Sequence, residues 1–209
     1  MRRLAKIGLS GIAAAIAAGL SGCGAARPAH YYSLGDFAAS PAANGASYPI
    51  VLVVGRVTAP HLLNDDRIVY GTGPVEMGAY EYHRWIDPPP EMLEEAIVEQ
   101  LRSTGQYKSV LRFTSRARGD YLLRGELLSL NELDSGGRVV ARCAFRVELF
   151  ESKTGNFVWG HNYVHEETVG RKTVDDVVGG LQRDVRTCLD ELVAHLSAFF
   201  AAHPPKASD

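Results

Sequence analysis

The sequence predicts an α+β fold, with a mixed, largely antiparallel sheet and two helices packed on it. Strand-like segments rich in β-branched and aromatic residues, two amphipathic helical patterns and turn residues at the joints between them all favour this class. Hydrophobic residues make up 46% of the 209 residues and charged residues 22%, which excludes disordered and polytopic membrane proteins. A net charge of −2 gives no global electrostatic reason to bind nucleic acid.

The first half of the predicted domain contains three strands and a helix. An apolar segment at 50–57 is typical of a buried strand, and residues 67–70 and 75–85 are expected to form a hairpin around 71–74. Three prolines at 88–90 then precede a helix of about fourteen residues whose apolar face contains Leu93, Ile97 and Leu101. Gly105 is expected to close this helix.

The second half predicts a meander of strands followed by a long helix. A short strand at 109–113 precedes longer ones at 121–130, 138–151 and 157–169, with turns at Gly136-Gly137 and Thr154-Gly155-Asn156. In the middle strand, apolar residues from Val139 to Leu149 alternate with Arg138, Arg142, Arg146 and Glu148, so one face packs and the other is solvated. An apolar stripe from Val174 to Phe199 predicts a helix over 174–200 that covers the sheet.

The N-terminus has the pattern of an export signal. Basic residues at 2, 3 and 6 precede twenty charge-free residues, and Leu20-Ser21-Gly22-Cys23 resembles the bacterial lipobox. In that motif the cysteine becomes the lipidated N-terminus of the mature protein. The alternative is an uncleaved transmembrane anchor, since the charge-free stretch is just long enough to span a bilayer. We expect a signal peptide at 1–22 and lipid attachment, palmitate included, at Cys23.

These signals divide the chain into four parts. After the signal peptide, residues 23–49 are expected to form the lipidated cysteine and a tether, because Ala, Gly, Pro and Ser dominate there. Tyr31-Tyr32-Ser33-Leu34 interrupts the tether with apolar surface, so we expect it to dock on the domain as an edge strand. The domain is placed at 50–203 and a flexible tail at 204–209. Gly24, instead of aspartate, favours sorting to the outer membrane by the enterobacterial rule.

No motif in the sequence indicates catalysis, a cofactor or a metal. His161 and His165, beside Glu166 and Glu167, superficially resemble a metal site, but on a strand the two rings start about 13 Å apart. One zinc ion cannot reach both. Gly71 and Gly73 are better explained by a turn than by a phosphate loop, because no helix follows them directly. A catalytic site assembled only by folding stays an alternative.

Two further groups of residues are candidates for a role. The stripe of Arg138, Arg142 and Arg146, joined by Arg124, offers positive charge to an acidic partner or to lipid headgroups, although Glu126 and Glu148 on the same face favour a solvated surface. Cys143 and Cys188 both fall on predicted core faces. In an oxidising compartment they form either a disulfide or two buried free thiols.

Several pieces of the chain, in order, resemble the PqiC-like ABC-type transport auxiliary lipoproteins. They are Tyr31-Tyr32-Ser33-Leu34 after the lipidated cysteine, Arg67-Ile68-Val69-Tyr70, Trp85 with Pro88-Pro89, and the run from Ser103 to Val110. The resemblance implies a domain similar to the N-terminal domain of TolB. It transfers one site residue, Cys23, and implies no catalytic or cofactor residue.

The resemblance also implies partners and a location. It predicts an outer-membrane-anchored protein on the periplasmic side that assists an ABC permease and ATPase and an MCE-type protein in lipid traffic between membranes. Exposed sheet edges make a homo-oligomer an additional expectation. The alternatives are a periplasmic hydrolase and a structural lipoprotein of the envelope.

Overall fold

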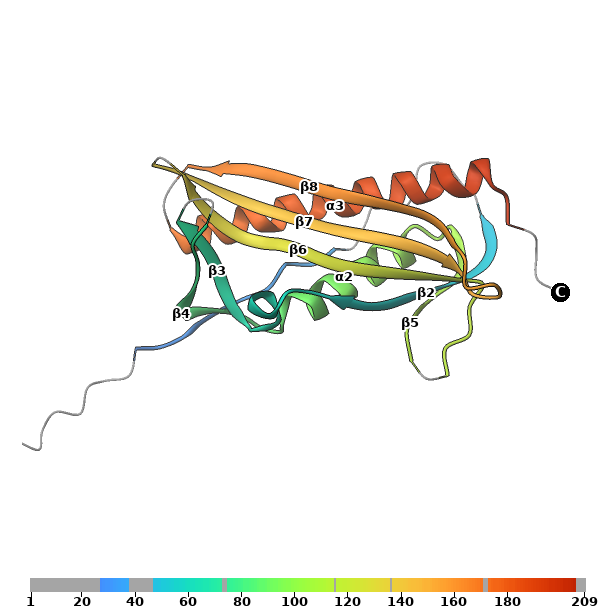
Figure 1. The fold of residues 1–209 in the computed structure, drawn as a ribbon, viewed down its shortest axis with the longest axis horizontal. Coiled ribbons are helices and arrows are strands. Elements are labelled where there is room, and N and C mark those ends of the chain that lie inside the picture. Colours follow the sequence, from blue (N-terminus) through green and yellow to red (C-terminus); the bar gives the residue numbers. More distant parts are fainter. Residues whose placement is uncertain are drawn as a thin grey trace, which may run out of the picture.

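In the computed structural model, a twisted sheet lies over two helices that both pack on one of its faces (Figure 1). The structure describes residues 27–37, 47–72, 75–114, 116–135, 137–170 and 173–205. Its strands are β1 (His30–Tyr32), β2 (Tyr48–Thr58), β3 (Arg67–Thr72), β4 (Met77–Trp85), β5 (Tyr107–Arg112), β6 (Tyr121–Ser135), β7 (Arg138–Glu151) and β8 (Phe157–Val169). The helices are α2 (Pro89–Ser103) and α3 (Val174–Ala202), with a short 3-10 turn, η1 (His61–Asn64). The predicted α+β class with a mixed sheet is confirmed.

Strand β6 organises the sheet. The first half of one of its edges pairs in parallel with β2, from Leu52 opposite Tyr121 to Thr58 opposite Glu126. The second half of that edge pairs in parallel with β3, and η1 lies between β2 and β3 in the chain. The other edge of β6 pairs with β7 over its full length, and β8 follows β7, both antiparallel. The meander β6-β7-β8 is therefore confirmed, and β2 and β3 share one neighbour.

Both helices start where local chemistry favours it. Pro89 and Pro90 occupy the first turn of α2, where their missing N–H groups cost nothing. Thr173 caps α3 by accepting a hydrogen bond from the Asp176 amide, and Asp175 and Asp176 place negative charge at the positive end of the helix dipole. Helix α3 covers β7 and β8, whereas α2 covers β2 and β5.

The core lies between the sheet and the helices. The predicted inward face of β7 is confirmed, since Val139, Ala141, Cys143, Phe145, Val147 and Leu149 are all buried. The predicted stripe of α3 is confirmed from Val177 to Leu196. At its end, however, Phe200 is fully buried and Phe199 only partly, because the fourth residue after Leu196, not the third, points at the sheet.

The largest difference between a predicted and an observed strand end is found in β6, which pairs with more than one strand. Strand β6 runs to Ser135, five residues beyond the predicted end, because β3 and β7 both pair with its second half. The predicted turns are confirmed by Gly137 and Gly155, whose φ angles of 88° and 74° lie in the region that glycine adopts without strain.

Candidate interaction surface

Residues 30–37, here called the strap, are part of the packed domain. Strand β1 extends the sheet in parallel beside β4, with His30 opposite His83 and their rings stacked at 5.1 Å. The Tyr32 hydroxyl donates to Asp175 Oδ1 at 2.8 Å and lies 2.9 Å from His83 Nδ1. Burial, and then the Asp175 carboxylate, raise the pKa of Tyr32 to about 12. The expected docking of this aromatic patch as an edge strand is confirmed.

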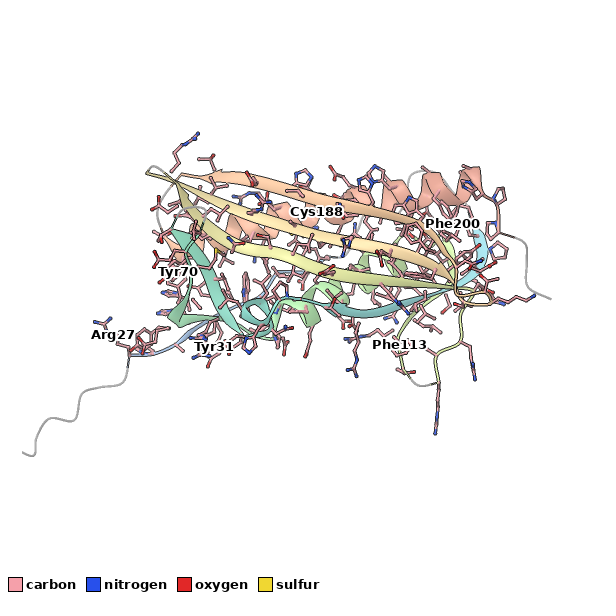
Figure 2. The ribbon with its side chains drawn as sticks, in the orientation of Figure 1. Arg27, Tyr31, Tyr70, Phe113, Cys188 and Phe200 are labelled. Atoms are coloured by element: carbon pink, nitrogen blue, oxygen red, sulfur yellow. The ribbon has the colours of Figure 1, made fainter. Side chains whose placement is uncertain are left out.

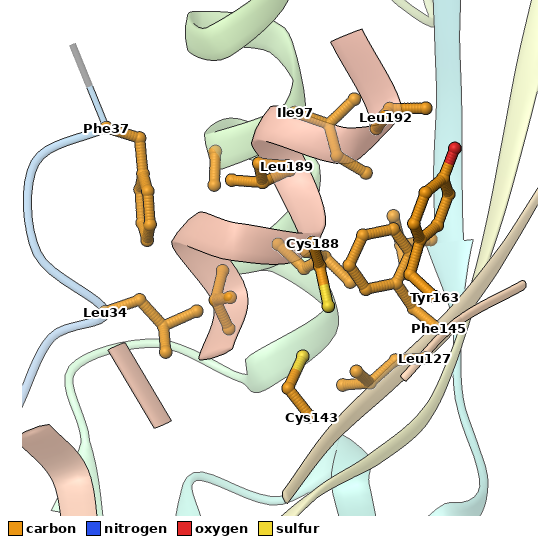
Figure 3. Packing of buried hydrophobic residues seen from close by; sticks show 14 of the residues in the cluster. Leu34, Phe37, Ile97, Leu127, Cys143, Phe145, Tyr163, Cys188, Leu189 and Leu192 are labelled. Carbon is orange, nitrogen blue, oxygen red and sulfur yellow. The ribbon is translucent and has the colours of Figure 1, made fainter. Parts of the chain in front are cut away.

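The strap then crosses to α3. Leu34 and Phe37 are each only 3% exposed, and Figure 3 shows both side chains reaching from the strap toward the helices. Gln182 donates to the Ser33 carbonyl at 2.9 Å, and Arg186 donates to the Asp36 carbonyl at 2.7 Å. The strap therefore joins the sheet edge to α3 by both apolar and polar contacts.

The strap fixes where the N-terminal segment leaves the domain. Cys23 lies outside the described residues, seven positions before His30. Seven fully extended residues reach about 25 Å at most. A lipid carried at Cys23 would therefore hold this end of the sheet close to a bilayer. In the described part of the chain, no helix is long and apolar enough to cross a membrane.

Cys143 and Cys188 meet in the core. Both are 0% exposed, and Figure 3 shows their sulfur atoms facing each other between β7 and α3. They are free thiols in this structure. The hydrogen bond with Cys188, and then burial, raise the pKa of the Cys143 thiol well above its usual value. The sequence placed each residue on a core face, and the fold brings the two together.

The histidines of β8 contact side chains of α3. His165 Nε2 lies 3.0 Å from Glu191 Oε1, and the His161 ring lies 4.4 Å from that of His195. The prediction that His161 and His165 lie on a strand is confirmed. Within the described ranges, no three His, Cys, Asp or Glu side chains are grouped as metal ligands would be.

A buried carboxylate lies near the cysteines. Asp184, one turn before Cys188 on α3, is 5% exposed, and its Oδ2 has no hydrogen-bond partner among the described residues. Burial, and then the charge of Glu167, raise the pKa of Asp184 to about 6. Arg183 instead binds Glu167 through two hydrogen bonds, of 2.6 and 2.7 Å, so the nearest arginine in the chain is already engaged.

The arginine stripe lies on the face of the sheet that the helices leave open. Arg142 pairs with Glu166, and Arg146 pairs with Glu126, as expected for a solvated face. Arg124 differs, because its guanidinium lies 4.7 Å from the centre of the Phe150 ring. This stacking places a positive charge at the border of an apolar surface.

Beside Arg124 the open face is hollowed. This outer groove has a volume of about 420 Å³ and is lined by Gly55, Arg56, Phe113, Leu122, Arg124 and Glu148, among others. Phe113, labelled in Figure 2 near the β5–β6 loop, is 50% exposed. Sequence reasoning missed Phe113, which lies just past the end of β5. It missed Arg56 because a pairing irregularity between Val54 and Val57 sets where the side chains of β2 point. A single strand pattern carries no signal for it.

One family model matches most of this chain, and solved structures share its fold. The model of the ABC-type transport auxiliary lipoprotein component matches residues 32–193. Protein XCC0632 from Xanthomonas campestris, a DUF330 protein, has a similar structure, with a TM-score of 0.77, 19% identity and coverage of 84% of this chain and 98% of that one. The hypothetical protein CT253 from Chlamydia trachomatis has a TM-score of 0.50 and 13% identity, covering 75% and 99%. No curated protein matches the sequence.

Proposed function

Because this chain belongs to the ABC-type transport auxiliary lipoprotein family, we propose that it is a non-catalytic adaptor that assists an ABC transporter and an MCE-type protein in moving lipid between the two membranes. The observation that carries the proposal is the family match, which runs from Tyr32 in the strap to Val193 in α3. It therefore spans most of the described fold. The lipidated residue is Cys23, and the membrane is the outer one.

The strap supports the anchored part of this proposal. An adaptor must hold its domain at a defined distance from one membrane while it contacts a partner. The six residues between Cys23 and His30 allow only a short reach, and the buried side chains of Leu34 and Phe37 hold the strap on the domain. The open face of the sheet is then available to a partner or ligand.

The test is an affinity purification of the full lipidated chain, tagged at its C-terminus, from chemically cross-linked membranes. We expect mass spectrometry to recover an MCE-type protein together with the permease and the ATPase. The matched control is Cys23→Ala, which should recover less of all three because it is no longer held at the membrane. Recovery of none of them from the lipidated chain would refute the adaptor role. Recovery of another outer-membrane protein alone would favour a structural lipoprotein.

Self-association is a separate part of the proposal. Strand β8 pairs only with β7 in the described sheet, and it carries the exposed side chains of Phe157 and Val164. An edge of this kind can pair with a second copy. Sedimentation of the detergent-solubilised protein should therefore give a mass above that of one chain, and a purely monomeric species would refute this part alone.

A further inference from the structure

An apolar row crosses the open face of the sheet next to the outer groove. The strand register places Leu122 of β6 opposite Phe150 of β7, and Phe150 opposite Phe157 of β8. Directly paired residues share a face, so these three side chains form one continuous line. At the usual spacing between strands, the line is about 10 Å long. Phe157 is 58% exposed, so the line is open to ligands at its end on β8.

The groove continues this apolar row toward β2 and β5. Phe113 follows β5 and contributes an exposed aromatic ring to the lining of the groove. At Gly55 a Cβ would lie 3.2 Å from the Leu123 carbonyl oxygen and 3.5 Å from Leu122 Cδ1, so a side chain there would occupy part of the groove. The volume of about 420 Å³ lies in the range of small-molecule sites.

The charges that line the groove favour an anion. Arg146 and Glu126 neutralise each other as an ion pair. Arg56 and Arg124 have no ion-pair partner among the described residues, and Glu148 is the remaining acidic group of the lining. The groove thus keeps a net positive charge. Guanidinium groups present paired donors that match carboxylate and phosphate oxygens, and Arg124 is held against the apolar row by Phe150.

We propose that the outer groove binds the acidic headgroup and the first part of the alkyl chain of an anionic membrane lipid. The headgroup lies on Arg56 and Arg124, and the alkyl chain follows Leu122, Phe150 and Phe157. This inference rests on the proposed transport role, for which it names a substrate class, and it assigns that class to the open face of the sheet. A zwitterionic lipid also carries a phosphate, but its quaternary ammonium group cancels the net negative charge that the positively charged groove favours.

The test uses the full lipidated chain in phosphatidylcholine vesicles that contain a small fraction of photoactivatable lysophosphatidylglycerol. We expect labelled peptides from β6, β7 and β8, and about tenfold less labelling of them when lysophosphatidylcholine carries the same photoactivatable group. The variant Arg56→Gln/Arg124→Gln should reduce labelling by the anionic probe by a similar factor. Arg142→Gln is the matched control on the same face, and it should label like the original protein.

Equal labelling by the two probes, or unchanged labelling of the double variant, would overturn the inference. Circular dichroism checks that each variant is folded. If the double variant is unfolded, Phe157→Ser tests the apolar row beside the groove, because its exposed side chain can change without disturbing the core. The labelling experiment and the affinity purification test the two proposals separately. A chain that is labelled at the groove but recovers no transporter component would refute the transport role and leave the lipid site standing.

Discussion

The buried carboxylate of Asp184 makes a prediction about stability and pH. Replacing it by asparagine keeps the shape of the side chain and removes its charge. Because burial raises its pKa from 3.8 to about 6, the folded protein holds the Asp184 proton more tightly than the unfolded chain does. Between pH 4 and 6 the unfolded chain releases this proton first. The contribution of Asp184 to stability is therefore fully present below about pH 4 and is lost as the pH rises through 6.

The size of the effect follows from the same change in pKa. Each tenfold change in the proton equilibrium corresponds to 1.36 kcal/mol, so the change from 3.8 to about 6 corresponds to about 3 kcal/mol at pH 7.5. Asp184→Asn should thus stabilise the protein by up to about 3 kcal/mol at pH 7.5 relative to its effect at pH 4. The carboxylates of Asp65 and Glu167 have lowered pKa values and act in the opposite direction, so the measured quantity is the difference between variant and original protein at each pH.

The assay is urea unfolding of the purified protein at several pH values from 4 to 8, followed by circular dichroism. Asp190→Asn is the control for removing a carboxylate from the same helix, because Asp190 is exposed and an asparagine there can still accept the hydrogen bond from Gln100. A difference between Asp184→Asn and the original protein that is the same at pH 4 and at pH 7.5 would refute the reasoning. It would mean that the buried Oδ2 is solvated or paired in solution.

Three further outcomes can be measured. In the secreted protein, Cys143 and Cys188 should form a disulfide. Closing a loop of roughly 45 residues should add about 4 kcal/mol to the free energy of unfolding, and a reductant should remove this gain. Non-reducing peptide mapping checks the bond, and recovery of both residues as free thiols after denaturation would contradict it. Phe37→Ala should destabilise the strap by about 3 kcal/mol, because it leaves a cavity at a buried site. Limited proteolysis should therefore cleave the strap of this variant faster than that of Tyr31→Ala, since the Tyr31 side chain is 64% exposed. Equal cleavage rates would contradict the packing of Phe37. Cys23→Ala should move the protein from the membrane to the soluble fraction, and retention in the membrane would indicate an uncleaved anchor.

The sequence predicts the elements well where one periodic pattern decides the structure. The alternation in β7 and the stripe of α3 each bury one face against a single neighbouring layer, so period alone identifies their inward residues. The same patterns do not show that β2 and β3 both pair with one edge of β6. That arrangement depends on contacts between segments far apart in the chain, and it extends β6 past its predicted end.

The candidate surface could be predicted only in part. The ion pairs of Arg142 and Arg146 follow from opposite charges on neighbouring strands, which the sequence displays. The outer groove depends on the pairing irregularity in β2 and on the absence of a side chain at Gly55, neither of which changes the apparent strand pattern. The burial of Asp184 could not be predicted, because an acidic residue in a helix is normally exposed. Its burial depends on how α3 is rotated about its axis against the sheet.

The strap also determines how mechanical load would enter the domain. If tension on a lipid-anchored N-terminus acted along the axis of β1, the hydrogen bonds between β1 and its parallel neighbour β4 would resist together in shear and would not open one after another. Behind them, Leu34 and Phe37 would have to leave their buried sites before the pull reached β2. A domain attached in this way would transmit force from the bilayer to its central sheet without first unravelling at its own edge.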